Sequence, residues 1–146
     1  MKTAAVLTAV STVLSLSGVL SLTAFAVAPG DYGLTEGNTI SAAGSSDPDV
    51  YIVNDWGYKR LFLNPAIFNL YGHLGGFAAV KNVSATTRDA FATSGLFRVD
   101  GTEKVYGLES MGEDTAVLHW VNTSGAQAVA DDANFFKKVF VINQAE

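Results

Sequence analysis

The hydrophobic pattern divides the chain into a leading apolar segment and a longer part in which apolar and polar positions alternate. Residues 1–28 carry one charge, Lys2, and otherwise only apolar side chains, glycine and small hydroxyls. As a helix, the uncharged run from Thr3 to Ala28 would be about 39 Å long, which is enough to span the roughly 30 Å core of a bilayer. The pattern therefore predicts a long hydrophobic N-terminal helix.

Two interpretations of residues 1–28 are open. In the first, the segment is a cleavable secretory signal, because Lys2 precedes the apolar run and Ala24-Phe25-Ala26 has the small-x-small form that a signal peptidase accepts. Cleavage would then fall after Ala26. The apolar run is, however, longer than the usual signal core of about 7 to 15 residues.

In the second interpretation, the segment is retained as an assembly or anchor helix. Helical spacing places small hydroxyls on one face and larger apolar side chains on the opposite face. Small hydroxyl residues allow two apolar helices to approach closely and to share hydrogen bonds. We therefore predict packing against copies of the same helix, with membrane contact during export. The residues of this predicted assembly helix are Val6, Val10, Val13, Leu16, Leu20, Thr8, Ser11, Thr12 and Ser15.

After Ala28, residues 29–49 are rich in Gly, Ser, Thr and Asp and predict a linker or extended arm. Residues 50–146 predict a β-rich globular domain, so that the whole chain belongs to the α+β class. Asn64-Pro65 is a good helix start, since Asn caps helices well and Pro suits the first helical position. The predicted elements are strands 50–53 and 60–63, a helix from Pro65 to Tyr71, a strand 77–83, a helix 84–93 capped by Ser84 or Thr86, and a hairpin with arms 96–99 and 104–108.

The β-rich part also contains an internal repeat. Each unit predicts the order strand, Gly turn, strand, Asn-capped helix, strand, and the two tandem units cover about 50–95 and 96–146. The matched positions are Val50 with Val105, Tyr51 with Tyr106, Gly57 with Gly112, Asn64 with Asn122, Phe77 with Phe135 and Val83 with Val141.

Two resemblances follow from these features. The layout of a long apolar N-terminal helix and a small β-rich domain resembles that of type IV pilins and their archaeal relatives, which implies a filament with a core of bundled helices. Bacterial pilins carry a carboxylate near the start of the helix, whereas position 5 here is Ala5. The β-rich part resembles a tandem repeat of exported surface proteins from candidate-phylum (ultrasmall) bacteria, through Gly57-Tyr58-Lys59-Arg60 and Asn64-Pro65. This second resemblance implies a cell-surface setting and no enzymatic activity.

Composition narrows the class of partner. The chain has no cysteine, so an exported domain must be stabilised by packing without disulfides. Its net charge is −5 and Lys2 is the only charge before residue 29, which leaves −6 on the rest. This balance argues against nucleic acid, because phosphate recognition needs clustered Lys and Arg. The basic pairs Lys59-Arg60 and Lys137-Lys138 are predicted to be solvated or to protect edge strands.

No catalytic motif is present, and we predict neither enzymatic activity nor a metal or cofactor. His73 and His119 have no second His at the spacing of a metal site. The close carboxylates Asp47/Asp49, Glu113/Asp114 and Asp131/Asp132 are predicted to be solvated loop acids. Asn82 and Asn122 begin acceptor patterns for glycosylation. The aromatic side chains are predicted to be core rather than a sugar-stacking platform, and Trp56, in a turn, is the candidate for ligand contact; the set is Tyr51, Trp56, Tyr58, Phe62, Phe97, Tyr106 and Trp120.

These observations favour a non-catalytic, extracellular structural protein, a subunit of a pilus-like filament or of a surface layer that assembles through its N-terminal helix. The alternative is a secreted binding module, for example for glycans, that is released after cleavage at Ala26.

Overall fold

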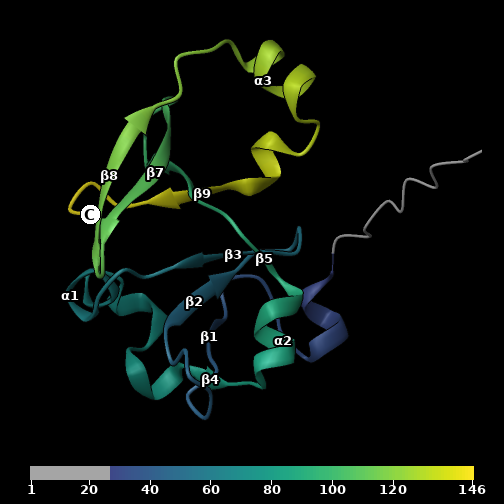
Figure 1. Cartoon of the computed structure of the whole chain (residues 1–146), viewed down its shortest axis with the longest axis vertical. Helices are drawn as coiled ribbons and strands as arrows, with labels where there is room; N and C mark the ends of the chain where they lie inside the picture. The colour runs from purple at the N-terminus through teal and green to yellow at the C-terminus, as the bar shows by residue number, and fades with distance from the viewer. Residues whose placement is uncertain (1–26) are drawn as a thin grey trace, which may run out of the picture.

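Two mixed β-sheets and several short helices form residues 27–146, the part of the chain that the computed structural model describes (Figure 1). The predicted α+β class is confirmed. The predicted N-terminal helix covers residues 1–28, and all of its assembly residues fall in 1–26, outside the described residues. Its last two residues, Val27 and Ala28, are described and are not helical: Ala28 is extended, with φ −84° and ψ 136°, immediately before a short 3-10 helix. None of the described helices combines the length and the apolar character that crossing a membrane requires.

The first sheet, sheet A, has five strands in the order β4-β1-β2-β3-β5. Its three central strands are antiparallel neighbours, whereas β4 and β5 run parallel to β1 and β3 at the two edges. The predicted strand 50–53 is confirmed, and its return begins two residues earlier than predicted. The strands are β1 (Thr39–Ser41), β2 (Val50–Val53), β3 (Tyr58–Leu61), β4 (Lys81–Asn82) and β5 (Ala92–Thr93).

The second sheet, sheet B, has four strands in the order β8-β7-β6-β9. β6 (Leu96–Val99) and β7 (Val105–Gly112) form the predicted hairpin, which is confirmed, and β8 (Thr115–Trp120) continues the antiparallel arrangement. β9 (Val139–Ile142) runs parallel to β6. Gly101 has φ +77° in the β6–β7 turn, a left-handed conformation that glycine adopts without steric cost.

The two sheets repeat one strand order: β4-β1-β2-β3 in sheet A corresponds to β9-β6-β7-β8 in sheet B. In each sheet, a central strand (β1 or β6) pairs antiparallel with the next strand along the chain. On its other side it pairs parallel with a strand that follows a helix later in the chain (β4 or β9). Ile40 of β1 thus lies between Tyr51 and Lys81, as Phe97 of β6 lies between Tyr106 and Phe140. Along the chain, the strands common to both sheets start with β1 and β6. These two strands precede Val50 and Val105, the first residues matched in the sequence repeat.

Short helices connect the strands, and side-chain caps fix their first turns. Asn64 accepts a hydrogen bond from the Ile67 N–H at 3.0 Å, and Ser84 accepts one from the Thr87 N–H, so both predicted caps are confirmed. The expectation of an Asn cap in the second unit is wrong, because Ser124 caps that helix. The helices are α1 (Pro65–Asn69), α2 (Ala85–Ala90) and α3 (Gly125–Asp131), with the 3-10 helices η1 (Pro29–Tyr32), η2 (Gly72–Leu74), η3 (Phe77–Ala79) and η4 (Phe135–Lys138).

Two predicted segments differ in the structure. The segment 29–49, predicted as a linker or extended arm, contains η1 and the buried strand β1, in which Ile40 has no exposed surface. The strand predicted over 77–83 is wrong for most of its length. After Gly76, with φ +65°, the chain turns into η3, and only β4 (Lys81–Asn82) pairs with β1. Both differences depend on pairing between distant segments, which local composition does not reveal.

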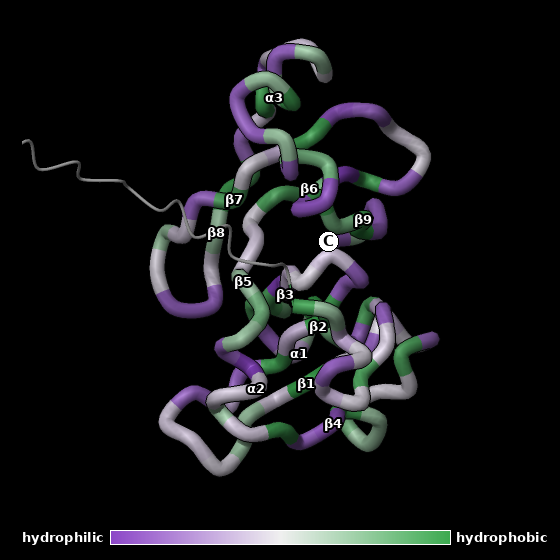
Figure 2. Tube along the Cα trace, turned by 90° about the vertical axis from the view of Figure 1, so that its right-hand side faces the viewer, coloured by the Kyte–Doolittle hydropathy of each residue, from purple (hydrophilic) through white to green (hydrophobic). Residues whose placement is uncertain are grey.

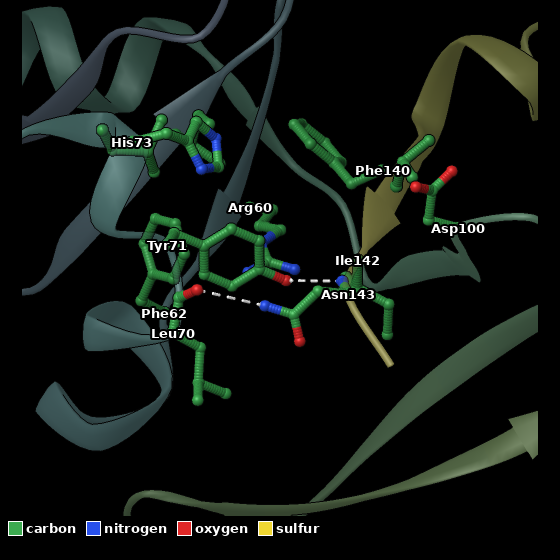
Figure 3. Close-up of a pocket in the computed structure, with 12 residues that line it drawn as sticks. Arg60, Phe62, Leu70, Tyr71, His73, Asp100, Phe140, Ile142 and Asn143 are labelled. Atoms are coloured by element: carbon green, nitrogen blue, oxygen red, sulfur yellow. Dashed lines mark hydrogen bonds between the residues drawn. The ribbon is translucent and has the colours of Figure 1, made fainter. Parts of the chain in front are cut away.

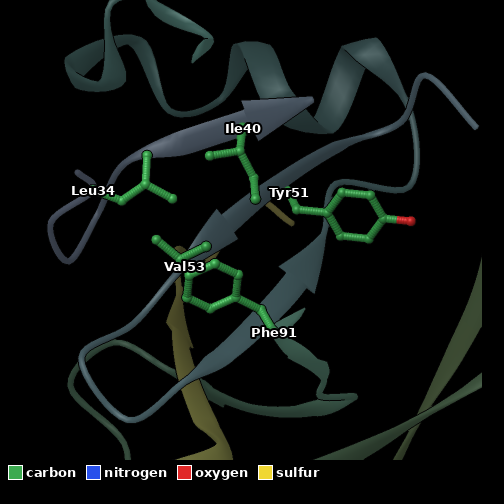
Figure 4. Close-up of a cluster of buried hydrophobic side chains, with 5 residues drawn as sticks. All are labelled: Leu34, Ile40, Tyr51, Val53 and Phe91. Atoms are coloured by element: carbon green, nitrogen blue, oxygen red, sulfur yellow. The ribbon is translucent and has the colours of Figure 1, made fainter. Parts of the chain in front are cut away.

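The core consists of three apolar clusters that cover both faces of sheet A. One face carries the cluster of Leu34, Ile40, Tyr51, Val53 and Phe91 (Figure 4). The opposite face carries Phe62, Phe68 and Tyr71, and a third cluster of Phe97, Phe140 and Ile142 on sheet B packs against Ile52 and Tyr58 of sheet A. In Figure 2 many of the outer loops are hydrophilic, whereas β1 and β6 carry hydrophobic segments. Sheet A is therefore enclosed between helices on one side and sheet B on the other.

Candidate assembly surface

The β7–β8 hairpin carries large apolar side chains that the fold leaves exposed. Met111, Val117, Leu118 and Trp120 are between 37% and 64% exposed. β8 is the outermost strand of sheet B (Figure 1). Several large apolar side chains exposed on one edge strand are typical of a site that contacts another molecule. The hairpin is therefore the candidate assembly surface of the described domain.

Both faces of β8 contribute to this surface. Leu118 lies opposite Leu108 and Trp120 opposite Tyr106, on the face that also carries Phe97. His119 lies on the other face, as alternation predicted, and its Nε2 is 2.7 Å from Oε2 of Glu109. Because both side chains are more than 60% exposed, this pair contributes little to stability.

β8 also lacks several of the features by which proteins protect an edge. Such strands are commonly very short or carry Lys or Pro, which discourage pairing with another chain. β8 has six residues and contains neither Lys nor Pro. The basic pair Lys59-Arg60, predicted to be solvated or to protect an edge, lies in β3 and is buried, so that prediction is wrong.

Lys59 and Arg60 are buried because adjacent strand residues point to opposite faces and both faces of sheet A are covered. On the helix-covered face, the Lys59 Nζ donates to the Arg88 carbonyl at 2.7 Å and lies 5.2 Å from the centre of the Tyr51 ring. Burial lowers the pKa of Lys59, while Asp89 opposes this change. Both charges therefore belong to the interior of the fold.

Arg60 lies between sheet A and sheet B (Figure 3). Its Nη2 is 3.0 Å from Oε2 of Glu146, whose side chain is 12% exposed. The Tyr71 hydroxyl donates to the same carboxylate and accepts a hydrogen bond from the Asn143 N–H at 3.1 Å. Burial raises the pKa of Tyr71, and the hydrogen bond to Glu146 acts in the same direction.

Aromatic rings complete the surroundings of this guanidinium. The centres of the Phe62, Tyr71 and Phe97 rings lie 4.6 to 5.4 Å from its Cζ. Arg60 Nη1 has no hydrogen-bond partner within residues 27–146, and ring faces partly compensate such a cation. Arg60 and Tyr71 border a cavity of about 360 Å³. Arg60 and Glu146 therefore form a buried ion pair that links the C-terminal residue to sheet A.

A second network holds the loop before β2. Arg88 Nη1 is 2.9 Å from Oδ2 of Asp47, and the Tyr51 hydroxyl donates to the same oxygen at 3.3 Å. Burial raises the pKa of Tyr51 to about 12, with Asp47 adding to the effect. Burial also raises the pKa of Asp49, and the neighbouring Asp47 charge contributes. Asp47 is therefore part of an ion pair rather than a purely solvated acid.

The other candidate residues are separate from one another. Glu113 and Asp114 form the β7–β8 turn, and Asp132 is 2.6 Å from the Nζ of Lys138. His73 lies at the rim of the cavity beside Arg60. Among residues 27–146, no three His, Cys, Asp or Glu side chains are grouped as a metal site would require.

Trp56, the predicted ligand contact, lies in the β2–β3 turn and is 52% exposed. Asn54 orders this turn, because its Oδ1 accepts hydrogen bonds from the N–H groups of Trp56 and Tyr58, both at 3.0 Å. The Nζ of Lys137 lies 4.9 Å from the Trp56 ring centre and covers part of the ring. Ligand contact by Trp56 stays a prediction.

The aromatic residues are divided between the core and the surface. Tyr51, Phe62 and Phe97 are buried, which confirms their assignment to the core. Trp120, also predicted as core, is 52% exposed on β8, so that prediction is wrong. Trp120 lies on an edge strand that has no outer neighbour among the described residues, which explains the difference.

The two glycosylation acceptors lie at exposed positions. Asn82 is in β4, and its Oδ1 accepts a hydrogen bond from the Ala43 N–H at 3.2 Å. Asn122 follows β8 in the loop before α3. Their modification stays a prediction.

Comparison with known proteins adds no relative: no family model, no curated protein and no solved structure matches this chain.

Proposed function

We propose that the chain is a non-catalytic, exported structural protein, a subunit of a pilus-like extracellular filament or of a surface layer that assembles through residues 1–28. The observation that carries this proposal is the junction between the apolar segment and the domain. Val27 packs against the cluster of Leu34 and Ile40, so the apolar run leads directly into the core of the domain. The described domain therefore begins with a residue that is packed against the core.

The domain then faces the medium. It is acidic overall and presents the exposed hairpin and the two predicted glycosylation acceptors away from the core. We further propose that the domain arose by duplication of one strand-turn-strand-helix-strand unit. The shared strand order supports this, as do η3 and η4, which begin at the matched residues Phe77 and Phe135.

The alternative, a secreted module released after Ala26, has one observation in its favour. Val27 is both the first residue after the predicted cleavage site and a residue in contact with the core. A mature chain beginning there would keep every described contact. In that case the exposed Trp56 is the contact to test, and Trp56→Ala should abolish retention on an immobilised glycan panel without changing the melting temperature.

Intact mass and N-terminal sequencing of the native protein separate the two functions. The filament or surface-layer proposal expects residues 1–26 to be present in high-molecular-weight material. A chain beginning at Val27 in such material overturns the role of the helix.

A pair of substitutions then tests how the helix packs. Thr12→Leu with Ser15→Leu keeps the segment apolar but removes small hydroxyls from the predicted contact face, so assembly should fall while export continues. Val13→Leu, on the opposite face, is the matched control and should assemble normally. Equal assembly by both variants contradicts the hydroxyl face as the contact.

A further inference from the structure

At three positions of β8, the backbone hydrogen-bonding groups have no strand to pair with among residues 27–146. The Val121 N–H donates to the Val105 carbonyl at 2.9 Å, and the Leu108 N–H donates to Gly95 on the other side of β7. Because backbone groups alternate in direction along an antiparallel strand, the odd-numbered residues of β8 bond to β7. Those that point to the open edge are Ala116, Leu118 and Trp120.

The corresponding edge in sheet A is covered. β3 occupies there the place that β8 occupies in sheet B, and β5 runs beside it, with Ala92 opposite Tyr58 and Thr93 opposite Lys59. For β8, no such strand exists within residues 27–146. The same topology is thus closed at one edge and open at the other. The open edge carries Leu118 and Trp120 on one face, and Val117 beside the polar His119 on the other.

We infer that β8 pairs antiparallel with β8 of a second copy of this chain, about a two-fold axis that passes next to Leu118. In this register Leu118 lies opposite its own counterpart, and Trp120 lies opposite Ala116 of the second copy. All three outward-pointing residues then form hydrogen-bonded pairs, which gives about six backbone hydrogen bonds. The two copies of sheet B become one continuous sheet.

The side chains of β8 favour a second copy as the partner. The bulky Trp120 meets the smallest side chain of the strand, Ala116, and the two Leu118 side chains meet each other. On the opposite face, Val117 lies opposite His119, so no like charges are placed opposite each other in this register. The strand is complementary to itself, as a closed two-fold interface requires. This pairing does not depend on whether residues 1–26 are retained.

A cysteine substitution tests the register, since the chain contains no cysteine of its own. In a hydrogen-bonded antiparallel pair the Cα atoms are about 5.5 Å apart, within the range of about 4.4–6.8 Å that a disulfide spans. Full-length Leu118→Cys should therefore form a covalent dimer under mild oxidation. Val141→Cys is the matched control, because Val141 is similarly exposed but lies on β9, at the opposite edge. Equal cross-linking of the two variants, or none at Leu118→Cys, overturns the proposal.

A proline substitution tests the hydrogen bonds. Leu118→Pro removes an N–H that points to the open edge, so the isolated chain should lose little stability, because proline is tolerated in edge strands. The readout is a disulfide between two copies of the full-length chain that carries Val117→Cys and His119→Cys, kept in mild nonionic detergent where residues 1–26 are present. This disulfide should form when Leu118 is intact and should be lost when Leu118→Pro is added. Persistence of that link in Leu118→Pro would contradict pairing through this edge. Loss of residues 1–26 from the native protein would remove the assembly helix but leave both cross-linking results unchanged.

Discussion

Sheet A and sheet B share a strand order, yet one is enclosed and the other is open. Sheet A has an apolar cluster on each face and a covering strand, β5, beside β3. Sheet B is covered mainly on the face toward sheet A, and every residue of β8 except the half-buried Ala116 is exposed. The strand order therefore does not decide what is buried. The segments that pack around each sheet decide it, above all the segment from Val27 to Leu34 and the residues around α2.

Corresponding positions in the two sheets show the contrast most clearly. Lys59 pairs with Val53 in sheet A, and Leu118 pairs with Leu108 at the corresponding position of sheet B. In the same way, Arg60 of β3 corresponds to His119 of β8. Sheet A thus buries two charges where sheet B exposes a leucine and a histidine. A buried charge is tolerated when its partners are built into the surrounding fold, as Glu146 and the aromatic rings are for Arg60.

The largest expected effect comes from removing that buried charge. Arg60→Met leaves the Glu146 carboxylate in the interior without its partner, and we expect a loss of about 3–5 kcal/mol in the free energy of unfolding. Denaturant unfolding measures it. Arg98→Met in β6 is the control from sheet B. The Arg98 side chain donates to the Thr102 carbonyl near the surface, so its loss should cost about 1 kcal/mol. Similar losses for both variants would contradict the difference between the sheets.

A smaller effect should depend on pH. The pKa of Tyr51 in the folded protein is about 12, against 10.0 for an ordinary tyrosine, so the folded state holds this proton more tightly than the unfolded state does. The associated stability is fully present below about pH 10 and is lost as the pH rises toward about 12. Unfolding midpoints measured across this interval should fall more steeply in the native protein than in Tyr51→Phe.

Tyr106→Phe, at the matching position of the second unit, is the control variant for these unfolding measurements. If the two substitutions flatten the pH dependence equally, the effect does not come from the Asp47 network around Tyr51.

The smallest expected effect compares the two helix caps. Asn64→Ala and Ser124→Ala each remove one side-chain hydrogen bond to a helix N–H, and each should cost about 1 kcal/mol. Asn64 also donates through Nδ2 to the Asp114 carbonyl in the β7–β8 turn, at 3.3 Å. Asn64→Ser keeps the cap but removes this link, so it should restore most of the lost stability and leave the hairpin turn looser in amide hydrogen exchange. Unchanged exchange at the turn would show that the link has no energetic role.

The features predicted correctly are those that neighbouring residues determine. Asn64-Pro65 and Ser84 indicate helix starts through bonds made within one turn, and Val50–Val53 indicates a strand through its composition. Asp100-Gly101 likewise predicts a turn between two apolar runs. Local chemistry is sufficient in each of these cases.

The features that the sequence did not reveal depend on distant partners. β1 consists of Thr39–Ser41 within a stretch typical of loops. It is buried because β2 and β4 pair with it and because Ile40 packs against Leu34 and Phe91, which lie outside both strands. The burial of Arg60 requires Glu146, which lies 86 residues further along the chain. The exposure of Trp120 depends on the absence of a covering strand beside β8 within the described residues. For the candidate surface, the alternation of β8 was predictable, but its open edge was not.

Asn54 and Ser94 join the two units at one place. The Asn54 Nδ2 donates to the Lys137 carbonyl at 2.8 Å, and the Ser94 hydroxyl donates to the Lys138 carbonyl at 2.6 Å. Both bonds reach from the first unit to the residues immediately before β9, so the last strand of the second unit enters its sheet from a position that the first unit fixes. Although the halves look like separate modules, the second half should therefore lose its structure when the first one does, and the domain should unfold as a single cooperative block.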